Sequence, residues 1–417
     1  MLQTPLDTPD SPDTPDSLDA ANRPGKATRD SALIEPTTRR SVLRHVPFTI
    51  SICVLVALTL VLFSQIAGAM ERSQGPTVAS QGKPVSPPDV RTTGDVATVV
   101  ARMQIYPTAD PRASLMQPVV DRKGYVWFGE MRANKLARLD PHTGEIREWA
   151  PPDGGYGLMM SALGPDDAIW FAEENSNYIG RFDPVTERFT TYPLPSYQGR
   201  TSQPQHLQFD RAGQLWFTLN RSGKIGRMNP DTGEIRMWQV LPPEGDQASR
   251  PYSLAVTPEG KVWFGAALYG GVVGSRDPET GIVTTHHLDR PTAQVTSMVS
   301  DTRGNVWFTE LQFNRLGHIN TRTGEVSELP LPEPVGTSTG NYALDVAPDG
   351  AVWISSFDAN AIIRYAPDSK KFTFYTLLVA KSVPFGLVAA PDGSIWFTSD
   401  GEPNDYIGHI YPSRETR

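Results

Sequence analysis

The sequence predicts an all-β protein, a seven-bladed β-propeller with four strands in each blade. The first observation is a repeat of seven short strands, in which an apolar residue stands on each side of a Trp: Trp127, Trp170, Trp216, Trp263, Trp307, Trp353 and Trp396. The steps between these Trp residues are 43, 46, 47, 44, 46 and 43, and a period in the forties is typical of propeller blades. The second observation is the turn chemistry: 35 Gly and 38 Pro among 417 residues argue against long helices.

Each repeat is expected to hold its strands in a fixed order. A Pro/Gly turn such as 391–394 leads into the Trp strand, and a short loop then leads to a third strand such as 224–228. A turn with Pro and Gly at fixed places, such as 229–233, comes before a polar, alternating edge strand. The last repeat ends after 406–410 without an edge strand, whereas an edge-strand pattern at 99–107, within the segment 97–107, precedes the first repeat. We therefore expect this N-terminal strand to close the seventh blade, which removes an unpaired sheet edge.

The propeller is expected to occupy residues 97–417, after three segments of different composition. Residues 1–45 carry a repeated Ser/Thr-Pro-Asp tripeptide, which predicts a disordered tail. Residues 46–70 contain no charge and are long enough to cross a bilayer as one transmembrane helix. A cleaved signal peptide is the alternative, because Ala-Gly-Ala at 67–69 resembles a cleavage site. Residues 71–96 have the composition of a linker.

Charge and cysteine content restrict the location and the partners. Arg39, Arg40 and Arg44 precede the apolar segment, so the positive-inside rule places the N-terminus in the cytoplasm and the propeller outside it, periplasmic or extracellular. The net charge of −8 removes the electrostatic basis for binding nucleic acid. The single cysteine, Cys53, excludes a disulfide framework and a thiolate metal site. We expect a monomer.

Two positions in each repeat are expected to point toward one mouth of the central channel. The first lies three residues after the Trp: Glu130, Glu173, Leu219, Ala266, Glu310, Ser356 and Ser399. The second lies eleven residues before it, on the inner strand: Met116, Met159, Gln205, Tyr252, Thr296, Tyr342 and Phe385. Binding sites of propellers are expected at such a mouth, where every blade contributes a loop.

The repeat resembles the streptogramin B lyases, the virginiamycin B lyase family, over about residues 97–417. The closest copies of the family pattern are 307–310 (Trp-Phe-Thr-Glu), 314–317 (Asn-Arg-Leu-Gly) and 177–181 (Asn-Tyr-Ile-Gly-Arg). The resemblance implies a seven-bladed propeller that opens a cyclic depsipeptide by elimination, with a His as general base and a Mg²⁺ ion held near carboxylates. It also implies that the His follows a Pro on an inner strand and that a Glu lies just past the Trp strand of the same blade.

The histidine of this pattern is not matched. The corresponding steps are Pro204-Gln205, Pro251-Tyr252 and Pro384-Phe385, and the last blade carries Phe385 and Ser399 at the two functional positions. His206 lies one residue beyond the family's place and is the candidate catalytic base. The alternative is a strand residue that faces a neighbouring blade.

Carboxylates and inner-strand residues supply the other candidates. Glu130, Glu173 and Glu310 are candidate Mg²⁺ ligands, because hard divalent cations prefer oxygen. The alternative is that they are solvated carboxylates or partners of basic strand residues. The candidate ligand-binding residues are Gln205, Tyr252, Tyr342 and Arg250, the last of which suits an anionic ligand.

Two functions remain open from the sequence. The first is a membrane-anchored extracytoplasmic lyase, a metal-assisted C–O lyase that acts on a cyclic depsipeptide or lactone. The second is a non-catalytic propeller that binds a small ligand or a protein partner. The unmatched histidine favours the second function, and the family resemblance favours the first.

Overall fold

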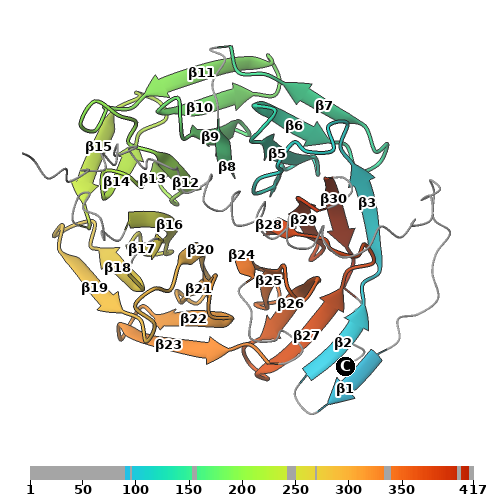
Figure 1. Cartoon of the computed structure of the whole chain (residues 1–417). Coiled ribbons are helices and arrows are strands. Elements are labelled where there is room, and N and C mark those ends of the chain that lie inside the picture. The colour runs from blue at the N-terminus through green and yellow to red at the C-terminus, as the bar shows by residue number, and fades with distance from the viewer. Residues whose placement is uncertain are drawn as a thin grey trace, which may run out of the picture. The chain divides into compact units, whose positions relative to one another are not determined.

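The prediction of a seven-bladed propeller is confirmed. The computed structural model describes residues 90–93, 96–152, 157–241, 250–267, 270–332, 340–401 and 405–412, and in these residues seven antiparallel blades surround a central axis (Figure 1). The expected tail, the apolar segment 46–70 and most of the expected linker lie outside the described residues. The part of the chain that is described contains no helix of the length and hydropathy that a membrane span requires.

Blades one to four each use four consecutive strands, ordered from the channel outward. Blade one has β4 (Val119–Val120), β5 (Val126–Glu130), β6 (Lys135–Leu139) and β7 (Ile146–Trp149). Blade two has β8 (Leu158–Leu163), β9 (Ile169–Glu173), β10 (Tyr178–Asp183) and β11 (Arg188–Pro193). Blade three has β12 (Pro204–Phe209), β13 (Leu215–Leu219), β14 (Lys224–Met228) and β15 (Ile235–Gln239). Blade four has β16 (Arg250–Val256), β17 (Val262–Ala267), β18 (Val272–Arg276) and β19 (Val283–His287).

Blades five to seven complete the ring. Blade five has β20 (Val295–Ser300), β21 (Val306–Glu310), β22 (Arg315–Asn320) and β23 (Glu325–Pro330). Blade six has β24 (Asn341–Val346), β25 (Val352–Ser356), β26 (Ala361–Ala366) and β27 (Lys371–Thr376), and two N-terminal strands extend it: β2 (Val96–Val100) and β1 (Val90–Thr93). Blade seven has β28 (Pro384–Ala389), β29 (Ile395–Ser399), β30 (Tyr406–Ile410) and, as its outer strand, β3 (Met103–Pro107).

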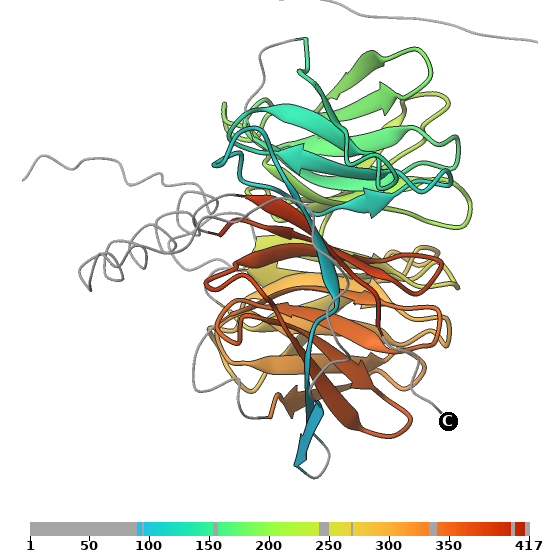
Figure 2. The same cartoon turned by 90° about the vertical axis from the view of Figure 1, so that its right-hand side faces the viewer.

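The strand that closes the ring is shorter than expected. β3 pairs with β30 in antiparallel register, Met103 opposite Ile410, as expected for the outer strand of blade seven. The earlier part of the 97–107 segment belongs elsewhere, because β2 pairs in parallel with β27 of blade six. Figure 2 shows β1, β2 and β3 following one another along the rim of the ring. One continuous segment therefore ties blade six to blade seven.

Packing between blades explains the Trp-Phe pairs. Neighbouring residues of a strand point to opposite faces, so Phe128 packs in the interface with blade seven while Trp127 packs in the interface with blade two. In five of the seven blades a Gly of the third strand makes room for the Phe of the Trp strand: a Cβ at Gly226 would lie 2.2 Å from the Phe217 ring, whereas blade one has Ala137 and blade six has Ile363 at this place. The recurring Ile-Gly-Arg segment is therefore required by packing rather than by a ligand.

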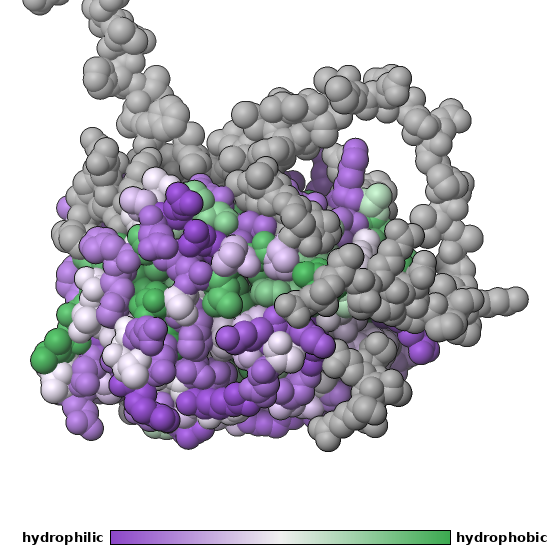
Figure 3. All heavy atoms as spheres, turned by 90° about the horizontal axis from the view of Figure 1, so that it is seen from below, coloured by the Kyte–Doolittle hydropathy of each residue, from purple (hydrophilic) through white to green (hydrophobic). Residues whose placement is uncertain are grey.

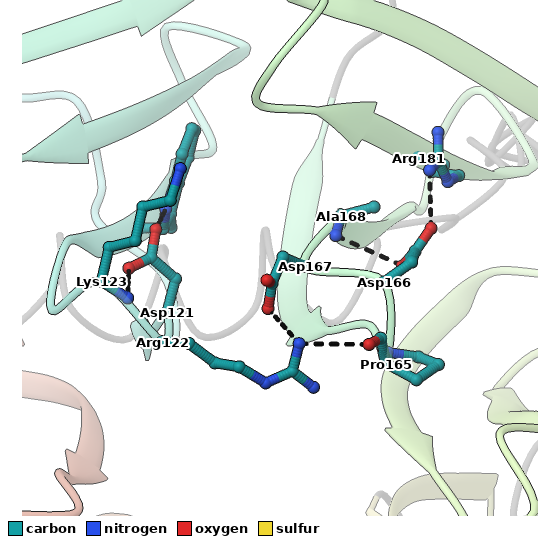
Figure 4. A network of polar contacts seen from close by, with 9 residues as sticks. Asp121, Arg122, Lys123, Pro165, Asp166, Asp167, Ala168 and Arg181 are labelled. Carbon is teal, nitrogen blue, oxygen red and sulfur yellow. Dashed lines mark hydrogen bonds and ion pairs between the residues drawn. The ribbon is translucent and has the colours of Figure 1, made fainter.

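Aspartates fix several turns at the end of the ring where inner strands end. Asp121 Oδ2 accepts a hydrogen bond from the indole N–H of Trp127 at 2.8 Å. Figure 4 shows this turn beside the equivalent turn of blade two, where Arg122 forms an ion pair with Asp167 and donates to the Pro165 carbonyl at 3.1 Å. These contacts join neighbouring blades at the end of the ring opposite to the candidate site.

The outer rim is a mixed surface. Figure 3 shows one side of it, where hydrophilic side chains surround smaller hydrophobic areas. The large apolar residues exposed in the described chain are Val100, Val185, Ile282, Leu378 and Tyr411, which lie far apart in the sequence. Single exposed apolar residues are normal for a soluble surface.

Candidate functional site

The two sequence positions expected at one mouth of the channel lie together. Each Trp strand ends where the inner strand of its blade begins, so that Glu173 pairs with Leu158 and Glu310 pairs with Val295. The mouth formed by these strand ends is called the site mouth below. It is built from seven copies of the same strand pair, so each blade contributes one residue of each kind.

A β-bulge changes the direction of the inner-strand side chains that lie at this mouth. In blades two to seven the register between inner and Trp strands shifts by one residue at the same point, for example between Pro204 and Leu207 and between Pro251 and Ser253. The residues expected to line the mouth, among them Gln205 and Tyr252, occupy the shifted segment. A bulge bends a strand and turns a side chain out of the regular alternation, and it is common next to functional sites.

A hydroxyl group two residues after the Trp holds several of these bulges. Thr218 Oγ1 accepts the His206 backbone N–H at 3.1 Å in its own blade and donates to the Tyr252 carbonyl of the next blade at 2.9 Å. Ser355 repeats the arrangement in blade six, with the Ala343 N–H and the Phe385 carbonyl. The sequence signal for this role is the hydroxyl residue two positions after the Trp, as in Trp-Phe-Thr at 216–218 and Trp-Ile-Ser at 353–355.

Aromatic side chains from three blades meet at the channel. The hydroxyl groups of Tyr252 and Tyr342 lie 2.5 Å apart, although the residues come from blades four and six. Tyr342 stacks on Phe385 of blade seven with ring centroids 3.9 Å apart, and Phe357 stacks on Tyr342 at 6.0 Å. We call Tyr252, Tyr342, Phe357 and Phe385 the aromatic wall. It draws on blades four, six and seven, whereas blade five presents Thr296 at the equivalent inner-strand position and blades one to three present Met116, Met159 and Gln205.

His206 lies in the interface between blades three and four. Its Nδ1 accepts the backbone N–H of Leu254 at 3.3 Å, and Gln208, two residues further along β12, accepts the N–H of Val256 at 3.0 Å. Desolvation by the surrounding protein lowers the pKa of His206 to about 4. This geometry is that of a strand residue facing a neighbouring blade, the alternative that the sequence left open, and a base with so low a pKa is weak near pH 7.

The three glutamates end their Trp strands and are completely buried. Burial, followed by the charge of Glu148, raises the pKa of Glu130 to about 7. Burial, followed by the charge of Glu328, raises the pKa of Glu310 to about 8. Lys135 and Arg315 stand opposite these two glutamates in register but form ion pairs with Glu148 and Glu328 of the outer strands.

Blades one and five thus repeat the same three-residue group, of which only the inner glutamate was predicted from the sequence. The basic residue follows the Trp by eight positions and the outer glutamate follows it by 21 positions in both blades, so the repeat itself carried the signal. The outer glutamate neutralises the cation, and desolvation of the charged form raises the pKa of the inner one. Glu310, with a pKa of about 8, is therefore mostly protonated at pH 7, whereas Glu130, with a pKa of about 7, is about half protonated.

The described residues do not fit a Mg²⁺ site built by Glu130, Glu173 and Glu310. The three carboxyl groups come from blades one, two and five, and the described chain contains no group of three or more His, Cys, Asp or Glu side chains that could hold a metal ion. The raised pKa values of Glu130 and Glu310 also work against a cation, because metal ligation requires the ionised form.

The remaining predicted ligand-binding residues lie at the site mouth. Gln205 is buried on the bulge of β12 and Arg250 is the half-buried first residue of β16, opposite Ala267. Tyr252 and Tyr342 belong to the aromatic wall. The structure therefore brings Tyr252 and Tyr342 together and places Gln205 on the neighbouring inner strand, while the three glutamates end strands of blades one, two and five.

Known proteins with this architecture match the chain over most of its length. The model of the Virginiamycin B lyase family matches residues 90–246 and 243–416. The chain belongs to the virginiamycin B lyase family. A virginiamycin B lyase from Nocardia farcinica is 31% identical over 167 residues, which are 40% of this chain and 53% of the relative, so the match spans about half of that relative's length.

Solved structures of virginiamycin B lyase family proteins superpose on the propeller. A streptogramin B lyase structure is 27% identical with a TM-score of 0.64, covering 74% of this chain and 97% of the other. A catalytically inactive histidine-to-alanine variant of virginiamycin B lyase from Staphylococcus aureus, with quinupristin, is 25% identical with a TM-score of 0.65 and coverages of 75% and 99%. Both likenesses cover almost the entire related chain.

Proposed function

We propose that this propeller binds a small cyclic peptide or lactone at the site mouth and does not open it by histidine-based elimination. The observation that carries the proposal is the aromatic wall, which places Phe385 where the family resemblance implies a base. Aromatic faces with a few polar groups are the usual lining of small-molecule sites. The related Staphylococcus aureus lyase is described as catalytically inactive when a histidine is replaced by alanine, which fits the loss of elimination here.

The competing proposal is the metal-assisted C–O lyase. Family membership supports it, with His206 as base and Glu173 or Glu310 near a Mg²⁺ ion. In such an elimination the base takes a proton from the carbon next to the carbonyl, the C–O bond to the ester oxygen breaks, and the carboxylate leaves. His206 would have to act with a pKa near 4 while its Nδ1 accepts the Leu254 N–H, so the geometry favours binding.

Incubation with quinupristin, with and without added Mg²⁺, separates these functions. We expect saturable binding by calorimetry and recovery of intact ligand by liquid chromatography and mass spectrometry. Elimination would give an isomer of unchanged mass but altered retention, and hydrolysis would add one water; either product would overturn the binding-only proposal. Absence of any binding would overturn the small-ligand proposal and leave a protein partner as the ligand.

We further propose that residues 46–70 anchor the chain in a membrane with the propeller outside the cytoplasm. The uncharged run of 25 residues and the three preceding arginines, Arg39, Arg40 and Arg44, support this proposal. The absence of cysteine after Cys53 makes the propeller insensitive to an oxidising compartment.

A further inference from the structure

The side chain of Gln205 is a buried carboxamide without a partner in the described part of the chain. It is 1% exposed, and neither Oε1 nor Nε2 has a hydrogen-bond partner there. Buried side-chain amides normally have at least one partner, because an unpaired buried donor or acceptor keeps its full desolvation penalty. The desolvation of this amide therefore lowers the stability of the folded protein, and no hydrogen bond within the described chain offsets it.

The position of Gln205 turns this amide away from the interface between blades. Successive side chains of a strand alternate, and His206 and Gln208 use their polar atoms to accept the Leu254 and Val256 N–H groups of blade four. Gln205 stands on the bulge before them. The equivalent bulge residues Tyr252 and Tyr342 reach each other from blades four and six, which shows that these positions point toward the axis of the ring.

The fold itself does not require an amide at this place. The equivalent residues of the neighbouring blades are Met159 and Tyr252, and the other inner strands carry a second Met, Thr, Tyr and Phe there. An apolar or aromatic side chain is thus compatible with the same bulge. The carboxamide is the one amide among the seven equivalent positions, which lie eleven residues before each Trp and all belong to the described chain.

A carboxamide presents a carbonyl oxygen and an N–H on the same edge. The partner that satisfies both atoms at once is another amide whose carbonyl and N–H lie on one edge, as in a cis peptide bond or a lactam ring. An ordinary trans peptide presents these groups on opposite edges, and a lactone has no N–H to offer Oε1.

We propose that Gln205 is the specificity-determining residue of the site mouth and selects cyclic ligands with a lactam or cis-amide edge over lactones. Nε2 donates to the ligand carbonyl, and Oε1 accepts from the ligand N–H, next to the aromatic wall. This inference rests on the proposed binding of a small cyclic ligand, and it specifies that the ligand carries a lactam or cis-amide group.

The test uses a cyclic dipeptide of glycine and phenylalanine and the same compound with both nitrogens methylated. We expect the unmethylated probe to bind the wild-type protein at least tenfold more tightly in ligand-observed NMR titrations. Gln205→Met is expected to remove this preference. Gln208→Met is the matched control: it lies on the same strand but serves the interface, so the preference should remain.

Stability measurements give an independent readout. Gln205→Met removes an unpaired amide and should leave the melting temperature unchanged or raise it, whereas Gln208→Met removes a hydrogen bond and should lower it. A comparable decrease in both variants would show that Gln205 has a partner within the fold and overturn the inference. Equal affinity for both probes, or binding of neither while quinupristin binds, would overturn it too. Failure of quinupristin itself to bind would instead overturn the proposed function.

Discussion

At the scale of single residues, burial raises the pKa of carboxyl groups at the site mouth more than neighbouring charges do. Glu310 illustrates this: a Glu in solution is ionised at pH 7, but burial and the nearby Glu328 raise its pKa to about 8. Arg315, which stands opposite Glu310 in register, forms its ion pair with Glu328. A buried carboxyl of this kind holds a proton that the unfolded chain would release.

The stability of the propeller should therefore fall as the pH rises. The folded pKa of Glu310 lies above its unfolded value, so the stability linked to its proton is fully present below about pH 4.5 and is lost as the pH rises through about 8. We expect Glu310→Gln, which mimics the protonated form, to reduce the decrease in melting temperature between pH 6 and pH 9. Glu325→Gln, an exposed residue of the same blade, should leave that decrease unchanged; equal slopes in all three proteins would contradict the prediction.

At the scale of strands, the N-terminal segment adds one strand to blade seven and another to blade six. β3 completes blade seven, and Tyr106 in it packs on Trp396 with ring centroids 5.8 Å apart and donates to the Pro141 carbonyl of blade one. β2 adds only to the outer edge of blade six. The two strands should therefore differ in their contribution to folding.

Two N-terminal truncations test this difference. A form that begins at residue 102 keeps β3 and should unfold cooperatively with a modest loss of stability. A form that begins at residue 108 lacks the closing strand, exposes the edge of β30 and should lose cooperative unfolding in denaturant titrations. Similar transitions for both forms would contradict this role of β3.

The Trp repeat was sufficient to predict the blades and the closing strand. It could not predict that the two halves of the 97–107 segment join different blades. Val99 and Ile105 both have edge-strand character, and nothing in their composition says that one joins blade six and the other blade seven. The bulges were also hidden, because a register shift of one residue leaves the sequence pattern intact. That shift decides that Gln205 leaves the interface while His206 enters it, so the roles of neighbouring residues could not be assigned from spacing alone.

At the scale of the whole molecule, the proposed anchor would fix the ring at a membrane surface. The propeller lies in a unit separate from residues 1–81, so we expect it to fold without the anchor. We expect the full chain to stay with membranes after alkaline carbonate extraction, and a form in which a cleavable signal peptide replaces residues 1–81 to be released by the same extraction. Release of the full chain by carbonate would contradict the anchor and favour cleavage of residues 46–70 as a signal peptide.

Because β3 and β30 lie at opposite ends of the propeller sequence, blade seven can close only after the last strand has been synthesised. The first strand of the blade emerges about 300 residues before its partner, a delay of roughly 15 to 60 s at bacterial or eukaryotic elongation rates. During this interval β3 has no partner and blade one lacks a neighbour on one side. Until its last strand emerges, the nascent ring presents unpaired strand edges, and on the export route proposed above we expect its yield to depend on protection from aggregation during this interval.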